Sequence, residues 1–102
     1  MKPNEKHKAP LPSPRGIRRA CSRELYRTVK RLGVYIPPER LTEAEELYFK
    51  KVVGNLIYIF EHRDNKKKQA DWWEEHVAPD IAKLWQIDEG ALVRAFRSGY
   101  GG

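Results

Sequence analysis

The sequence predicts an all-α fold, a compact bundle of four or five helices within residues 13–99. Apolar residues recur at intervals of three and four in several segments, as they do along one face of a helix. Capping residues precede most of these segments, and proline or glycine follows them. No pair of alternating segments indicates a sheet. With 102 residues, the chain has room for a single hydrophobic core.

Residues 1–12 are predicted to form a flexible basic arm, because they combine three lysines with three prolines and have no periodic apolar residues. They also lack the apolar stretch of a secretory signal. No segment approaches the ~20 apolar residues that cross a bilayer. We therefore expect a cytoplasmic protein, or a nuclear one in a eukaryote, with no membrane partner.

The first helix is predicted to have Ser13 as its cap, Pro14 as its first residue and Gly33 at its end. Its apolar stripe has five residues, namely Ile17, Cys21, Leu25, Val29 and Leu32. Its opposite side is cationic, with Arg15, Arg19, Arg23, Arg27, Lys30 and Arg31, and with Arg18 at the boundary. Such a helix is expected to dock on its own domain and to present positive charge to a polyanion.

A connector follows, since the pair Pro37-Pro38 cannot lie inside a helix. Thr42 and Glu45 have the spacing of a capping box, in which the side chain of each residue binds the backbone N–H of the other. This box predicts that the second helix begins near Glu43.

The second helix is predicted to be the central one. Its apolar residues cover about half of the circumference; they are Tyr48, Val52, Val53, Leu56, Ile57, Ile59 and Phe60. An arc this wide predicts contacts with neighbours on several sides. Gly54, within the arc, indicates the close approach of another helix.

Residues 62–69 are polar and are predicted to be a helix end and a loop, which includes three consecutive lysines. Asp71 and Glu74 are expected to cap a third helix. Pro79 is expected to break that helix, and a short helix is expected to restart at Asp80.

Asp88 is predicted to cap a last helix that runs to about Ser98 and ends at Gly99. Residues 100–102 are expected to fray.

Trp72 and Trp73 are adjacent, so both cannot point to one helical face. If one of them lies in the core, the other is expected to be partly exposed. An exposed tryptophan next to Lys66, Lys67 and Lys68 is suited to stacking on unpaired bases or to anchoring a protein partner. Packing of both inside the domain is favoured over either role.

Four positions near the C-terminus follow a known spacing. Ala82 is a small residue in the first of two helices, Gln86 takes the turn position, Ile87 follows directly, and Leu92 comes ten residues after Ala82. This segment, residues 78–98, resembles a helix-turn-helix motif. The family has glycine at the turn because a left-handed backbone is inexpensive there, whereas this chain has glutamine.

The resemblance implies a recognition helix from about Glu89 to Ser98, whose exposed side enters a DNA major groove. It also implies that Arg94 and Arg97 contact bases or phosphates. The alternative is an ordinary αα-hairpin, in which the same spacing follows from the packing of two short helices.

Catalysis and metal binding are not expected. His7, His62 and His76 are scattered, and Cys21 is a lone cysteine on an apolar stripe. No glycine-rich phosphate loop is present. We therefore predict no enzyme activity, no metal site and no cofactor.

Charge is unevenly distributed along the chain. Residues 1–32 hold ten Lys or Arg and two Glu, whereas the other seventy hold ten Lys or Arg and twelve Asp or Glu. The sequence therefore predicts a small nucleic-acid-binding protein, a DNA-binding regulator or accessory factor, with DNA favoured over RNA. The predicted contacts are Arg15, Arg18, Arg19, Arg23, Arg27, Lys30, Arg31, Lys66, Lys67, Lys68, Arg94 and Arg97.

An alternative is an adaptor or inhibitor that docks its basic helix on an acidic surface of a larger protein complex. A homodimer is compatible with either function, because two half-sites or the wide apolar arc of the second helix would favour pairing.

Overall fold

The computed structural model describes residues 11–101, so most of the predicted basic arm lies outside the described residues. All regular elements in this range are helices, which confirms the all-α prediction. Their bounds are α2 Pro14–Leu32, α3 Pro38–Gly54, α4 Leu56–Glu61, α5 Lys66–His76, α6 Ala78–Trp85 and α7 Glu89–Tyr100. These described helices number six instead of four or five, because the predicted second helix is divided into α3 and α4.

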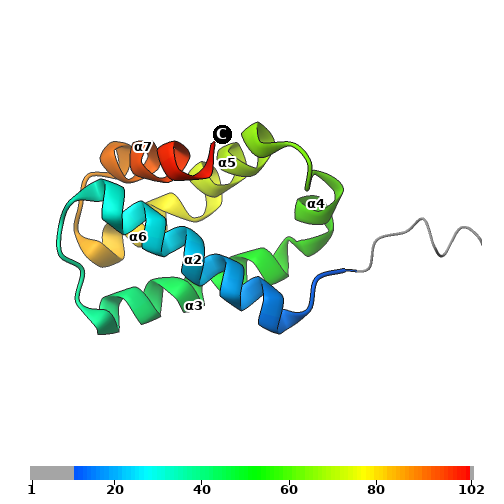
Figure 1. Cartoon of the computed structure of the whole chain (residues 1–102), viewed down its shortest axis with the longest axis horizontal. Helices are drawn as coiled ribbons and strands as arrows, with labels where there is room; N and C mark the ends of the chain where they lie inside the picture. The colour runs from blue at the N-terminus through cyan, green and yellow to red at the C-terminus, as the bar shows by residue number, and fades with distance from the viewer. Residues whose placement is uncertain (1–10, 102) are drawn as a thin grey trace, which may run out of the picture.

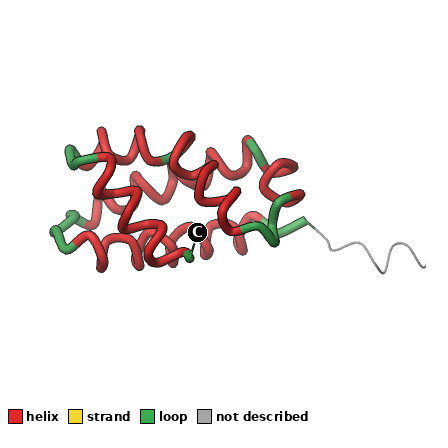
Figure 2. The backbone as a smooth tube through the Cα atoms, turned by 90° about the horizontal axis from the view of Figure 1, so that it is seen from above, coloured by secondary structure: helices red, strands yellow, loops and turns green. Residues whose placement is uncertain are grey.

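Helix α2 crosses the front of the molecule, with α7 on one side of it and α3 on the other (Figure 1). Helix α6 lies behind α2 in this view and contacts α3, α5 and α7. Helix α4 lies at the same end of the molecule as the first turn of α2 (Figure 1). The view from above shows short loops at the two ends of a helical body (Figure 2). The core therefore lies mainly between α2 and the C-terminal helices.

The predicted boundaries of α2 are confirmed. Ser13 Oγ accepts a hydrogen bond from the Gly16 N–H at 3.0 Å, and Pro14 is the first helical residue. At the other end, Gly33 has φ +74° and donates its N–H to the Val29 carbonyl at 3.2 Å. Three of the five predicted stripe residues are buried and two are partly buried. The apolar face of α2 therefore faces the core.

Helix α3 begins at Pro38, so the predicted start near Glu43 is wrong. The Thr42 hydroxyl donates to the Pro38 carbonyl at 3.0 Å, inside the helix, instead of capping its N-terminus. Proline is well suited to the first helical position, where no N–H partner is needed. The start of α3 is therefore set by Pro37-Pro38 and not by the predicted capping box of Thr42 and Glu45.

The predicted central role of the second helix is also wrong. Only Ala44 and Tyr48 are buried in α3, and no residue of α4 is buried. Val53, Ile57 and Tyr58 are 46%, 61% and 42% exposed. The chain breaks at Asn55, so the two halves of the apolar arc do not face one neighbour.

Gly54 does not mark a close approach of helices. A Cβ atom added there would meet nothing within 4 Å among the described residues. The glycine instead ends α3, next to Asn55, whose side-chain amide donates to the Lys51 carbonyl at 2.9 Å.

Helix α5 begins at Lys66, inside the segment predicted to be a loop. Asn65 caps it by accepting the Lys68 N–H at 3.0 Å, so the predicted cap at Asp71 is wrong. The buried Gln69 amide donates to the carbonyls of Ile59 and His62 at 2.9 and 2.7 Å. These bonds connect the C-terminal end of α4 to α5.

Trp72 and Trp73 are both buried, at 6% and 1% exposure, which confirms the favoured prediction that both pack inside the domain. The partial exposure expected of one of them if the other lay in the core is not observed. Trp73 stacks on Phe96 of α7 with ring centroids 3.8 Å apart, and Trp72 lies against His76 at 5.5 Å. Since α5 contacts both α6 and α7, two of its faces are covered. Neither tryptophan is available to stack on bases.

The break around Pro79 is confirmed, although α6 restarts at Ala78 instead of Asp80. Asp88 caps α7 as predicted, because its carboxylate accepts the Ala91 N–H at 2.8 Å. Helix α7 runs to Tyr100, two residues beyond the expected end. The Tyr100 ring stacks on Phe96 at 5.1 Å and therefore belongs to the packed helix.

Candidate nucleic-acid interface

The cationic face of α2 is open to solvent. All seven predicted side chains are exposed, namely Arg15, Arg18, Arg19, Arg23, Arg27, Lys30 and Arg31. Within residues 11–101, none of the seven forms an ion pair with a carboxylate. The single acid of α2, Glu24, is partly buried, and this burial raises the pKa of its carboxyl. The positive charge of this face is therefore available to a partner.

The first half of α2 forms one wall of a groove of about 910 Å³ between α2 and α3. The arginines that line it are Arg15, Arg18, Arg19 and Arg23. Tyr26 and Phe49 also line the groove, and the Arg18 guanidinium lies 5.2 Å from the Phe49 ring centroid. The Ser22 hydroxyl donates to Glu45 Oε2 at 3.0 Å, which ties α2 to α3. We call this the α2–α3 groove.

The aromatic residues of the α2–α3 groove were not among the predicted site residues. Tyr26 lies three and seven residues after Arg23 and Arg19, so it shares their helical face. This aromatic residue among the cations of a polar helix face is the feature of the sequence from which Tyr26 could have been predicted as a site residue. Phe49 had no such signal, because its position depends on how α3 packs against α2.

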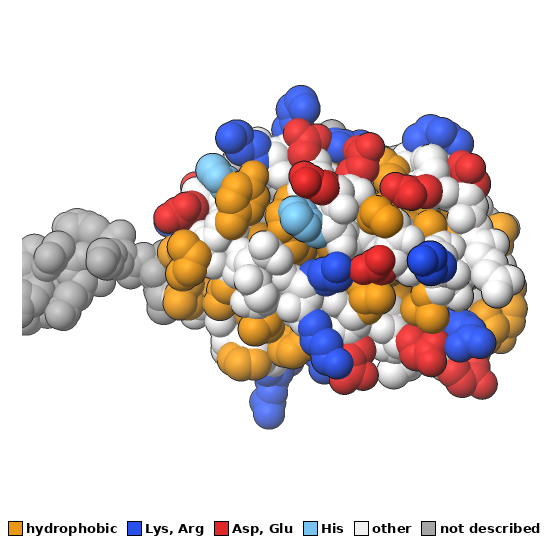
Figure 3. Space-filling view, turned by 180° about the vertical axis from the view of Figure 1, so that it is seen from behind, with side chains coloured by type: hydrophobic (Ala, Val, Ile, Leu, Met, Phe, Trp, Pro, Cys, Tyr) orange, Lys and Arg blue, Asp and Glu red, His pale blue; other side chains and the backbone are white. Residues whose placement is uncertain are grey.

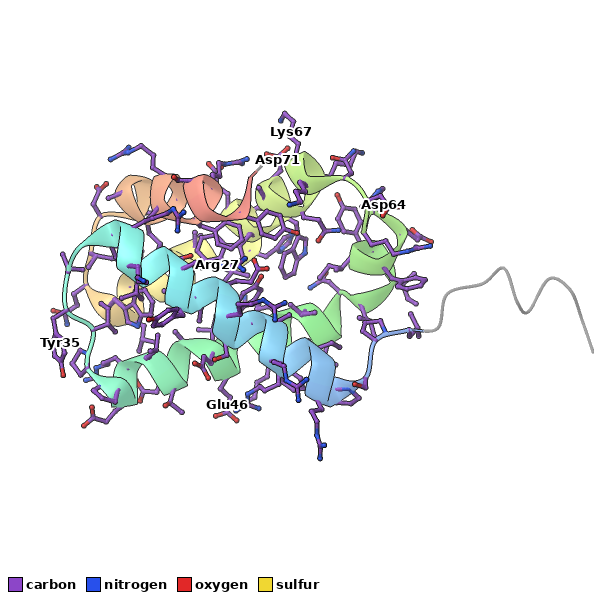
Figure 4. The ribbon with its side chains drawn as sticks, in the orientation of Figure 1. Arg27, Tyr35, Glu46, Asp64, Lys67 and Asp71 are labelled. Carbon is purple, nitrogen blue, oxygen red and sulfur yellow. The ribbon has the colours of Figure 1, made fainter. Side chains whose placement is uncertain are left out.

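The second half of α2 lies next to α7. Arg31, Arg94 and Ser98 line a shallow groove of about 350 Å³ between the two helices. A Cβ atom added at Gly99 would lie 3.3 Å from Arg31 Nη1, so the helices cross closely there. Figure 4 shows Arg27 near the middle of α2. The fold therefore brings Arg94 next to the cations of α2.

Arg97 is paired within the molecule. Its guanidinium donates to Asp71 at 2.6 Å and to Glu74 at 2.7 Å, and its side chain is only 26% exposed. The hydrogen bonds to Glu74 and Asp71 raise the pKa of Arg97, and its guanidinium lowers the pKa of Asp71. Arg97 therefore connects α7 to α5.

The three lysines of the predicted basic loop lie in the first turn of α5. Lys67 pairs with Asp71 at 3.2 Å, and the two side chains lie side by side in Figure 4. Lys66 donates to the Tyr100 carbonyl at 3.4 Å and lies 5.7 Å from the Tyr100 ring centroid. Lys68 is exposed and has no carboxylate partner among residues 11–101. Lys66 and Lys67 are therefore held by contacts within the protein, whereas Lys68 points to solvent.

Carboxylates gather beyond α7, on the side away from α2. Asp71, Glu74, Glu75 and Glu89 line a shallow depression there. Helix α7 therefore has cations on its α2 side and acids on its α5 side. A polyanion is attracted to the first side and repelled from the second.

The cysteine and the histidines, which are the remaining residues suited to catalysis or metal binding, do not form a cluster in the described part of the chain. Burial raises the pKa of the Cys21 thiol to about 12, which keeps it protonated at neutral pH. His62 lies against Tyr58, His76 lies against Trp72, and His7 is outside the described residues. Within residues 11–101, no group of three His, Cys, Asp or Glu side chains could hold a metal ion.

The fold and this surface define a small all-helical protein with an exposed cationic helix face. No family model, curated protein or solved structure matches the chain. None of the helices between residues 11 and 101 has the length and apolarity needed to cross a membrane.

Proposed function

We propose that this protein binds nucleic acid through the cationic face of α2 and acts as a DNA-binding regulator or accessory factor. The observation that carries the proposal is that seven cations of one helix are exposed and have no carboxylate partner among the described residues. Contacts of Lys and Arg with phosphates supply affinity without reading sequence. The residues proposed to make them are Arg15, Arg18, Arg19, Arg23, Arg27, Lys30 and Arg31.

Sequence preference is proposed to come from α7, as the second helix of a helix-turn-helix. This part is supported by the left-handed backbone of Gln86, with φ +56° and ψ +49°, at the turn position. Ala82 and Leu92 are buried and Ile87 is partly buried, as that motif requires. A plain αα-hairpin would bury the same residues. Arg94 is the proposed contact, because Arg97 is held by two acids.

The test is a salt titration of the full chain with random-sequence duplex DNA. Phosphate contacts by all seven residues predict a slope of about −6.3 in a plot of log K against log salt. Arg19→Gln with Arg23→Gln is expected to reduce that slope by about 1.8 and to weaken binding to all sequences equally. Lys50→Gln with Lys83→Gln removes the same charge from exposed positions of α3 and α6 and is the control. Absence of binding, or binding that does not respond to salt, contradicts the proposal.

The second candidate function is that of a protein adaptor or inhibitor. It is favoured by the exposed apolar side chains Val53, Ile57 and Tyr58 on α3 and α4. In the view from behind, hydrophobic side chains gather at the end where α4 lies (Figure 3). Recovery of one stoichiometric protein partner after nuclease treatment, together with no DNA binding, would support this candidate instead.

A further inference from the structure

We infer that the α2–α3 groove binds unpaired nucleotides, with a base stacked on Tyr26 and the strand's phosphates on the arginines that line the groove. The inference rests on the proposed nucleic-acid function and adds to it the form of nucleic acid that this groove accepts. The duplex contacts proposed above require only exposed cations. An aromatic ring among the cations adds a surface on which an unpaired base can stack.

The first step is the exposure of Tyr26. Its side chain is 58% exposed, although it lies on a helix and lines the groove. The faces of bases in a duplex are covered by the neighbouring base pairs, so an aromatic ring can stack only on an unpaired base. Such stacking contributes strongly and tolerates any sequence, because every base has a π-face.

The second step is the charge around Tyr26. Four arginines line the groove, against the single carboxylate of Glu45. One oxygen of that carboxylate accepts the Ser22 hydroxyl, which holds it at the α2–α3 contact. An isolated surface tyrosine is common and needs no explanation. Tyr26 lines the groove together with the four arginines, and the Lys30 ammonium lies over its ring, 5.4 Å from the centroid. An exposed aromatic ring beside cations matches the combination of stacking and positive charge that binds single strands.

The third step is the position of Arg18. Its guanidinium lies over the Phe49 ring, 5.2 Å from the centroid, which holds it at the side of the groove. Planar guanidinium groups also stack on splayed-out bases. The groove therefore contains two groups that are able to stack on a base, the Tyr26 ring and the Arg18 guanidinium.

The fourth step is spacing along the helix. Arg15, Arg19 and Arg23 follow one another at intervals of four residues. Four residues of α-helix rise about 6 Å, which is close to the separation of consecutive phosphates in an extended strand. The groove has a volume of about 910 Å³ and, like the shallow depressions on either side of α7, is widely open to solvent. Space for a nucleotide is therefore present beside the arginine row.

The experiment measures fluorescence anisotropy of labelled single-stranded DNA, single-stranded RNA and duplex DNA of one length, each titrated with the full chain. Tyr26→Ala is expected to weaken binding of the single strands at least about fivefold. It is expected to change duplex binding less than about twofold. Tyr26→Phe keeps the ring and is expected to retain single-strand affinity. Tyr35→Ala is the matched control, because Tyr35 is 81% exposed and lies in the loop between α2 and α3 (Figure 4).

The outcomes separate the two proposals. If no nucleic acid binds, the proposed function itself fails. If duplex DNA binds with the expected salt dependence but Tyr26→Ala leaves single-strand affinity unchanged, only the inference about the groove is overturned. An acidic peptide that binds as tightly as the single strands, with the same loss in Tyr26→Ala, would also overturn it and assign the groove to a protein partner. The Tm of each variant verifies that it folds. Because Tyr26 is exposed, Tyr26→Ala is expected to leave the Tm unchanged.

Discussion

At the scale of single residues, the charges of this protein fall into two groups that sequence cannot separate. Arg94 and Arg97 are three residues apart and both seemed suited to DNA contact. Arg97 meets Asp71 and Glu74, which lie 26 and 23 residues away in sequence, whereas Arg94 is exposed. The difference depends on the packing of α5 against α7. A helical pattern places a charge on a face, but only the tertiary fold supplies its partner.

The pairing of Asp71 predicts a pH dependence of stability. Arg97 and Lys67 lower the pKa of Asp71 in the folded state, so its contribution is present above the unfolded pKa near 3.8 and is lost as pH falls through the lower folded value. Asp71→Asn is expected to lower the Tm by about 2–4 °C at pH 7, and this difference should disappear at acidic pH.

The control is Asp64→Asn. Asp64 lies in the connection between α4 and α5, and no ion pair holds it within the described part of the chain (Figure 4). Thermal unfolding is followed by circular dichroism at a series of pH values. Equal Tm values for Asp71→Asn and the parent protein at pH 7 would contradict the pairing.

At the scale of elements, success and failure of the predictions have physical causes. The bounds of α2 depend on neighbours in sequence, namely Ser13, Pro14 and Gly33, and were predicted correctly. The start of α5 was missed because three lysines in a first turn oppose the helix dipole, which makes that turn a poor candidate for a helix N-terminus. The burial of both Trp72 and Trp73 was favoured, but the sequence did not show how two adjacent residues could both be covered, since this requires α6 and α7 to pack on two faces of α5.

The turn between α6 and α7 gives the prediction at this scale. Gln86 has φ +56°, and a left-handed backbone costs an L-residue about 1–2 kcal/mol. Glycine at this position relieves the strain of the folded state, but it also increases the conformational entropy of the unfolded chain, which offsets part of the gain in stability. Gln86→Gly is therefore expected to raise the free energy of unfolding by about 0.5–1 kcal/mol.

Lys83→Gly is the matched variant, because Lys83 is an exposed residue inside α6. Glycine at a helical backbone position is expected to lower the free energy of unfolding by about 1 kcal/mol. Urea titration measures both. A loss of stability in Gln86→Gly would contradict the left-handed turn.

At the scale of the whole molecule, Cys21 reports on the closure of the core. It is a residue of α2, on the face that packs on the core; it is 2% exposed, and burial raises its thiol pKa to about 12. We expect it to react with a chromogenic disulfide reagent at pH 8 more than about 100-fold slower in the folded protein than in denaturant. Stopped-flow or manual absorbance measurements follow the reaction. Similar rates in the two states would show that α2 does not cover this part of the core.

The arrangement of charge on either side of α7 has a consequence for kinetics. Guanidinium groups on one flank and carboxylates on the other give this part of the protein a permanent electric dipole. A polyanion diffusing past exerts a torque that turns the basic flank toward it before contact, so encounters are oriented and a larger fraction of collisions is productive. Mobile salt ions shorten the range of that torque, and the association rate constant falls as they accumulate.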